Sequence, residues 1–185
     1  LASPTGRAAK RLAEATGHEA STIHRLLKFD PISGQFSKNE EDPLEVDYLV
    51  IDEVSMMDLK LCASLLSAVP DNAKVLLVGD ADQLPSVGAG AVLRDFVASV
   101  NVKTSRLERI HRQGKGSGIV SAAHAILNGE VPQTVQGDNG IGDFFISYHD
   151  DAEQATEVLQ KVITERIPDK YGIDVDKDLL VLSPM

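Results

Sequence analysis

The clearest hydrophobic pattern in the chain is the apolar run Tyr48–Ile51, which ends in two adjacent carboxylates, Asp52 and Glu53. A nearly continuous apolar run with β-branched residues is typical of a parallel strand buried on both faces. In open α/β sheets, ligands bind at the carboxyl ends of the strands. The pattern therefore predicts a functional site at Asp52 and Glu53, and the alternative is a pair of acids that begins a solvated loop.

A second apolar run, residues 74–80, predicts another buried strand and also ends in an acid, Asp80. The segment 58–69 between the two runs has apolar residues at helical spacing. A strand, helix and strand in succession form a right-handed parallel unit, so both acidic ends are expected at one edge of the sheet. Gln83, in the loop that follows, is a neutral side chain able to orient a water or to bind a phosphate oxygen.

The remaining periodicity predicts further elements on both sides of this unit. We expect one strand to end near residue 3 and others to cover 102–107, 143–148 and 179–182. We expect helices over 7–16, 21–27, 117–127 and 150–166, and one that ends at 98. This alternation of strands and helices indicates an α/β fold.

Two of the predicted helices begin with hydroxyl residues that are typical of N-caps. Thr5 would cap the helix 7–16, and Ser21 or Thr22 the next one, which leaves His24 near solvent. The start of the first helix suits a phosphate, because it offers unpaired amides together with the Thr5 hydroxyl and Arg7. A plain capped helix has the same residues, so both interpretations stay open.

Residues 29–44 are polar and rich in turn-forming residues, and Ser33-Gly34 predicts a small β-hairpin. An isolated hairpin of two strands is only marginally stable. The segment is therefore either a loose loop or a projecting functional element.

The composition is that of an ordinary globular protein, with 43% hydrophobic and 25% charged residues. Aromatic residues make up only 4%, which argues against a surface that stacks single-stranded bases. The net charge of −10 is uneven: residues 1–28 and 102–116 carry a basic excess, whereas 29–60 and 138–178 hold most of the acid. An acidic chain can therefore still present a basic strip to nucleic acid.

Neither a signal peptide, a lipidation motif nor an apolar run of membrane-spanning length is visible. The single cysteine, Cys62, excludes an intrachain disulfide, which fits a reducing compartment. We therefore expect a soluble, cytoplasmic protein. Because the chain begins inside a motif and stops directly after a predicted strand, we also expect a fragment of a larger protein.

Candidate groups for nucleoside triphosphate hydrolysis follow the predicted strands. The two acids form a Walker B arrangement, in which Asp52 would hold magnesium through water and Glu53 would accept the proton of the attacking water. Gln83 would sense the γ-phosphate. Arg109 and Arg112 offer positive charge for phosphate oxygens, with a basic surface turn as the alternative. The chain contains no G-x-x-x-x-G-K-[ST] phosphate loop.

Five motifs occur in this order along the chain: SPTGRAA at 3–9, STIHRLL at 21–27, VIDEVSM at 50–56, GDADQLPSVG at 79–88 and RIHRQ at 109–113. This is the order found in superfamily 1 DNA helicases, and the chain most resembles the RecD-like branch, the exodeoxyribonuclease V α subunit family. The resemblance covers essentially the whole chain. It implies an ATP-driven DNA helicase of 5′ to 3′ polarity in recombination and repair, built from two RecA-like domains of the P-loop NTPase fold.

By this resemblance, Asp52 and Glu53 bind magnesium and activate water, Gln83 senses the γ-phosphate, and Arg112 contacts it. The resemblance implies DNA contacts at Pro4, Thr5, Gly6, Thr22 and His24. The implied cofactors are ATP and Mg²⁺. The implied partners are single-stranded and duplex DNA, with other subunits of a RecBCD-type nuclease complex as further candidates and no membrane.

Residues 1–137 are expected to form the first motor domain without its Walker A segment, and 138–185 to begin the second. The hairpin within 29–44 falls where this family projects a strand-separating pin. Because the phosphate loop and the later motor motifs are absent, we expect this 185-residue piece to be inactive by itself. The alternatives are a non-catalytic DNA- or partner-binding module of RecA-like fold and another superfamily 1 helicase, Pif-like or relaxase-linked.

Overall fold

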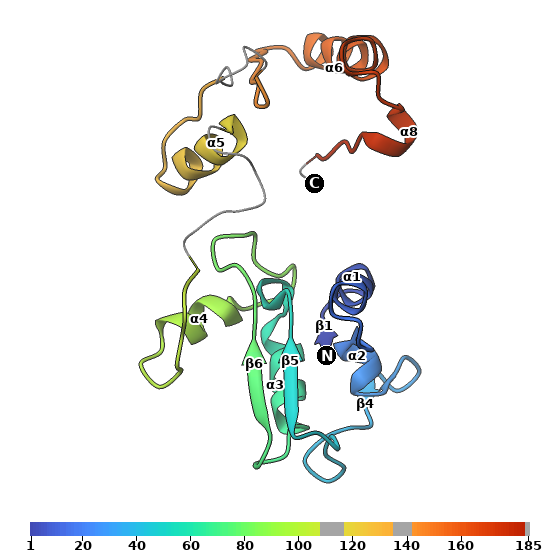
Figure 1. Ribbon diagram of the computed structural model, residues 1–185, viewed down its shortest axis with the longest axis vertical. Coiled ribbons are helices and arrows are strands. Elements are labelled where there is room, and N and C mark those ends of the chain that lie inside the picture. The colour runs from blue at the N-terminus through green and yellow to red at the C-terminus, as the bar shows by residue number, and fades with distance from the viewer. Residues whose placement is uncertain (108–116, 135–141, 184–185) are drawn as a thin grey trace. The chain divides into compact units, whose positions relative to one another are not determined.

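The computed structural model describes residues 1–107, 117–134 and 142–183, and the chain divides into two compact units, residues 1–108 and 109–185 (Figure 1). Within the second unit, the Ser117 hydroxyl and the Gly118 amide both donate to Asp143. The domain boundary after residue 137 and the assignment of two RecA-like domains stay predictions.

A parallel four-stranded sheet lies at the centre of the first unit, in the order β2-β1-β5-β6. Its strands are β1 (Ala2–Ser3), β2 (Ser21–Thr22), β5 (Tyr48–Ile51) and β6 (Lys74–Leu77). Ala2 pairs with both Ser21 and Ile51, and β5 pairs along its whole length with β6. Because all four strands are parallel, their carboxyl ends lie at one edge of the sheet, as the sequence predicts.

Helices follow these strands, and the predicted caps at Thr5 and Thr22 are confirmed. The helices are α1 (Gly6–Thr16), α2 (Ile23–Leu26), the 3₁₀ turn η1 (Val54–Met56), α3 (Leu59–Ser67) and α4 (Val92–Ala98). Thr5 accepts a hydrogen bond from the Ala8 amide and Asp58 accepts one from the Leu61 amide. These bonds satisfy amides that have no partner inside the helix.

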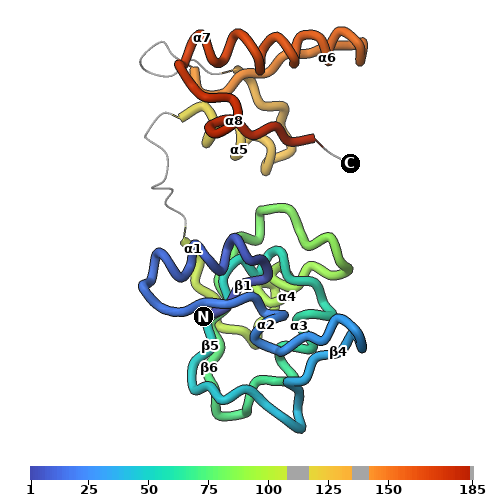
Figure 2. Tube along the Cα trace, turned by 90° about the vertical axis from the view of Figure 1, so that its right-hand side faces the viewer, coloured from blue at the N-terminus to red at the C-terminus, as the bar shows by residue number. Residues whose placement is uncertain are grey.

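The hydrophobic core of this unit forms where α2, α3 and α4 pack on the sheet, and α3 covers one face of the β5 and β6 pair (Figures 1 and 2). Its buried side chains are Ala2, Ile23, Leu27, Leu44, Leu49, Ile51, Val54, Met57, Leu61, Cys62, Leu65, Ala68, Val92 and Leu93. The core thus runs under the strand end that carries the two acids.

The predicted hairpin is confirmed, with β3 (Phe29–Asp30) paired antiparallel to β4 (Gln35–Phe36). Gly34 adopts a positive φ of 69° in the connecting turn, a conformation that glycine reaches without a steric penalty.

Two expectations for the first unit are wrong. Strand β6 is not buried, because β5 is its one neighbour among the described strands and its residues Val75 and Leu76 are exposed. Residues 102–107 form no strand: the Arg106 guanidinium pairs with Asp82, and no backbone pairing to the sheet is made there. The position of a strand depends on a partner, which an apolar pattern does not supply.

In its described part, the second unit is helical. Its elements are α5 (Gly118–Leu127), α6 (Ala152–Lys161), the π-helical turn η2 (Val162–Arg166), α7 (Ile167–Tyr171) and α8 (Val175–Asp178). The Asp151 carboxylate caps α6 by accepting from the Glu153 and Gln154 amides, close to the predicted position. The helical stretch continues past Arg166 to Tyr171, where Gly172 ends it with a positive φ of 65°.

The strands expected at 143–148 and 179–182 are not formed. The Asp143 carboxylate instead caps α5, and the Ile146 amide donates to the Thr134 hydroxyl. Residues 180–182 are exposed and have no strand partner among the described residues. In the described part of the chain, no helix is both long and apolar enough to cross a membrane.

We predict that Asp143→Ala lowers the unfolding temperature of the chain at neutral pH and that this difference disappears in acid. The hydrogen bond from Ser117 holds the pKa of Asp143 below its ordinary value. A lowered carboxyl pKa stabilises the fold above the unfolded-state pKa, and the stabilisation is lost as pH falls through the folded-state value. Thermal unfolding followed by circular dichroism at several pH values measures the effect. The matched control is Asp150→Ala, and an equal loss in both variants would contradict the prediction.

Candidate functional site

Asp52 and Glu53 leave the sheet at the carboxyl end of β5, and both are half-buried. The Asp52 amide donates to the Ala2 carbonyl at 3.0 Å, which extends the β1 pairing by one residue. One oxygen of the Asp52 carboxylate accepts from the Glu53 amide at 2.9 Å. Glu53 has φ 57° and ψ 40°, left-handed values that are uncommon for a residue other than glycine and that recur at functional sites.

The turn after the acids packs on the loop that follows β6. The Val54 amide donates to the Val78 carbonyl at 3.0 Å. A Cβ on Gly79 would lie 3.0 Å from the Val54 nitrogen and 3.2 Å from that of Ser55. Only glycine allows the two backbones to approach so closely, and this contact joins the acidic turn to the start of the loop that carries Gln83.

Gln83 is held near Asp80 and remains exposed. Its amide nitrogen Nε2 lies 3.4 Å from Asp80 Oδ2, and the Asp82 amide donates to Asp80 Oδ1 at 3.0 Å. Gln83 and Ser55 both line one small depression, together with Arg94. The structure therefore brings the predicted sensor beside the turn that follows the two acids.

Two arginines that the sequence analysis missed hold this loop. Arg94 Nε donates to the Ala81 carbonyl at 2.9 Å, and the Arg106 guanidinium pairs with Asp82 at 2.8 Å. No local pattern connects Arg94 with the loop, because α4 folds back to bring it there. The predicted Arg109 and Arg112 lie outside the described residues, so their roles stay predictions.

Two buried hydroxyls near the acidic strand end have no hydrogen-bond partner among the described residues, those of Ser3 and Ser55. Ser3 is 0% exposed and Ser55 is 9% exposed. A buried hydroxyl without a partner costs free energy, and such groups recur where a fold keeps a polar atom for function.

The residues predicted to contact DNA lie at the same edge of the sheet. Pro4, Thr5 and Gly6 follow β1, and Thr22 and His24 belong to or follow its neighbour β2. The Thr22 hydroxyl accepts from the Arg25 amide at 3.1 Å and so begins α2.

The first helix presents a basic face beside these residues. Arg7, Lys10 and Arg11 are exposed on α1, as is Arg25 on α2. The nearest acid on α1 is Glu14, 3.9 Å from Lys10 across an exposed pair, a geometry that contributes little. The local charge therefore suits the phosphates of a polyanion.

Asp52 and Glu53 by themselves offer few ligands to a metal ion. In the described part of the chain, no group of three or more His, Cys, Asp or Glu side chains could enclose a metal ion. Mg²⁺ commonly binds through one or two carboxylates, with waters and substrate phosphates as its other ligands. The half-buried Asp52 and Glu53 fit that donor set.

Comparison with known proteins identifies what this arrangement is similar to. Residues 1–89 match the AAA domain family. The chain is 48% identical over 132 residues to the ATP-dependent RecD2 DNA helicase of Deinococcus radiodurans. The aligned region covers 71% of this chain and 18% of that protein. It is 38% identical over 175 residues to the RecBCD enzyme subunit RecD of Mycobacterium tuberculosis, covering 84% of this chain and 30% of that protein. The ATP-dependent DNA helicase dda of Enterobacteria phage T4 is 28% identical over 98% of the chain and 47% of its own length.

A parallel sheet flanked by helices and the match to the AAA domain family together define an α/β P-loop NTPase fold, as predicted. The chain is a homologue of the RecD and RecD2 DNA helicases, which confirms the resemblance read from its motifs. It spans less than a third of the length of these two relatives.

We predict that Ser55→Ala stabilises the chain, by about 1 kcal/mol, because it removes a buried hydroxyl that has no partner in the described part of the chain. Urea denaturation measures the change in the free energy of unfolding. The control is Ser67→Ala: the Ser67 hydroxyl donates to the Ser64 carbonyl at 3.2 Å, so its removal should give no gain. A loss of stability in Ser55→Ala would mean that the hydroxyl has a partner in solution.

Proposed function

We propose that this chain forms part of the motor of an ATP-dependent DNA helicase that moves 5′ to 3′ and unwinds duplex DNA in recombination and repair. The observation that carries the proposal is the packing of the Asp52 and Glu53 turn on the Gly79 backbone. This packing joins the two acids to the loop that carries Gln83, at the sheet edge from which α1 and α2 also begin. The helicase relatives support the same activity.

In this proposal the chain contributes the hydrolytic half of an ATP site. Asp52 holds Mg²⁺ through water, and bound Mg²⁺ supplies positive charge to the phosphates. Glu53 accepts the proton of the water that attacks the γ-phosphate, and ADP and phosphate are the products. Gln83 contacts a γ-phosphate oxygen, and Arg112 stabilises the charge of the transition state.

DNA would lie across the edge that carries α1 and α2. Pro4, Thr5 and Gly6 at the start of α1, with Thr22 and His24 at α2, contact the tracking strand in this proposal. The exposed basic side chains of α1 favour the phosphate backbone. Single-stranded and duplex DNA are the proposed partners, with other subunits of a RecBCD-type complex as further candidates. The helicase relatives favour a cytoplasmic location.

Glu53→Gln in the full-length protein should lower DNA-stimulated ATP turnover by about 100-fold or more, because general-base catalysis contributes on that order. Binding of single-stranded DNA should be unchanged, since Glu53 faces the nucleotide in this proposal. Steady-state ATPase assays and fluorescence anisotropy measure the two properties. The control is Glu45→Gln, an exposed acid just before β5. Full turnover by Glu53→Gln would exclude the hydrolytic role and favour a non-catalytic binding module.

Removal of the hairpin should separate unwinding from ATP hydrolysis. In the full-length protein, replacing residues 30–35 by two glycines is expected to abolish strand separation. ATPase on single-stranded DNA should stay within about twofold of the unaltered protein, since the catalytic groups lie elsewhere. A forked-duplex unwinding assay and an ATPase assay on the same preparation test this. An equal loss of both activities would mean that the hairpin supports the fold instead of parting the strands.

A further inference from the structure

The hairpin is too short to be rigid by itself. Strands β3 and β4 have two residues each, and a hairpin of two strands is marginally stable in water. Its tip projects into solvent, where Ile32 is 96% exposed. An element that parts two DNA strands must nevertheless keep its position under load, so its root needs support from the rest of the unit.

One support is a cluster of three rings. Phe29 and Phe36 are paired across the hairpin, and their ring centroids lie 5.0 Å apart. The His24 ring of α2 lies 5.4 Å from Phe29 and 5.6 Å from Phe36. Rings at these separations attract one another beyond the area that they bury, so the cluster fixes one side of the hairpin root on α2.

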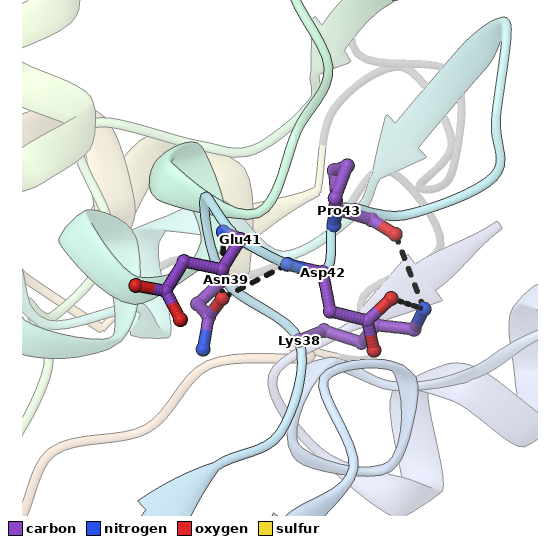
Figure 3. Close-up of polar contacts among 5 residues, drawn as sticks. All are labelled: Lys38, Asn39, Glu41, Asp42 and Pro43. Carbon is purple, nitrogen blue, oxygen red and sulfur yellow. Dashed lines mark hydrogen bonds and ion pairs between the residues drawn. The ribbon is translucent and has the colours of Figure 1, made fainter.

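The second support is the turn after β4, residues 37–44 (Figure 3). The Lys38 ammonium donates to Asp42 Oδ1 at 2.8 Å and to the Pro43 carbonyl at 3.1 Å. Asn39 Oδ1 accepts from the Glu41 amide at 2.8 Å and from the Asp42 amide at 3.1 Å. These bonds close the turn on itself and give it a defined shape.

The closed turn is attached to the core at both ends. The Lys38 amide donates to the carbonyl of the buried Leu27 at 3.1 Å, and the Leu44 amide donates to the Ala68 carbonyl at the end of α3 at 2.8 Å. Leu44 itself is only 5% exposed. The turn therefore connects the hairpin root to α2 on one side and to α3 on the other.

Lys38 is the one cation in a turn with three acids, Glu40, Glu41 and Asp42. Its side chain is 12% exposed, and two acceptors already occupy its ammonium. It is therefore poorly placed to bind a phosphate, and its removal would leave like charges close together without compensation.

We propose that residues 37–44 brace the hairpin and that Lys38 is a positioning residue for strand separation, acting through the hairpin and not on DNA. This inference rests on the proposed role of the hairpin as a strand-separating pin. Loss of the Lys38 bonds frees the turn, the hairpin root moves, and ATP hydrolysis is no longer coupled to unwinding.

The test uses the full-length protein with Lys38→Met, which keeps an apolar stem and removes the donors. Unwinding of a forked duplex should fall by about tenfold or more, while single-stranded DNA-stimulated ATPase stays within about twofold. The salt dependence of DNA binding should be unchanged, because no phosphate contact is lost. Lys38→Arg should restore much of the unwinding. The matched control is Lys177→Met, which breaks a 2.7 Å ion pair with Asp174 in the second unit.

A direct readout of position is a nitroxide label on Ile32→Cys, with any other reactive cysteines replaced. Cys62 is buried, and burial raises the pKa of its thiol, so this cysteine reacts poorly. Lys38→Met should increase the mobility of the label at the hairpin tip, and Lys177→Met should not.

The outcomes separate the brace from the pin. If replacement of residues 30–35 abolishes unwinding but Lys38→Met unwinds normally, the brace is wrong and the pin stands. If that replacement leaves unwinding intact, the pin is wrong and the brace with it. If Lys38→Met loses ATPase and unwinding equally, Lys38 supports the fold and the positioning role is overturned. If DNA binding by Lys38→Met depends less steeply on salt, Lys38 binds DNA and the positioning role is again overturned.

Discussion

The parallel pairing of β5 with β1 and β6 is the constraint on which the candidate site depends. The pairing brings the carboxyl ends of the strands to one edge. It continues past the strands, because the Asp52 amide donates a hydrogen bond to the Ala2 carbonyl and the Val78 amide donates one to the Ile51 carbonyl. A slip of one residue would turn every side chain of β5 to the other face. The turn after Asp52 and Glu53 would then lose its packing on Gly79.

The same edge carries the residues of the proposed nucleotide site and of the proposed DNA path. Helices α1 and α2 begin where β1 and β2 end. Because β1 and β2 are paired through their backbones, the residues that follow these two strands start from neighbouring positions. The His24 ring then connects α2 with the two phenylalanines of the hairpin. The end of β2 and the root of the hairpin are therefore connected through α2.

Expectations failed where an apolar run lacked a partner. Residues 102–107 and 179–182 have strand-like composition, but the structure pairs neither with another strand. Residues 143–148 read as a strand, and Asp143 serves as a helix cap instead. These two hydrogen bonds also join 117–134 to 142–183. Strand formation depends on distant segments, whereas a helix satisfies most of its own backbone.

The sequence alone determined the local features: the caps at Thr5 and Thr22, the turn at Gly34, and the order of motifs that identifies the RecD-like resemblance. Each depends on residues a few positions apart, where spacing and side-chain chemistry suffice. Only the tertiary structure decided which distant groups meet. It set the close approach at Gly79 and the buried hydroxyl of Ser55. These features arise from packing between segments far apart in the chain, for which no local pattern carries a signal.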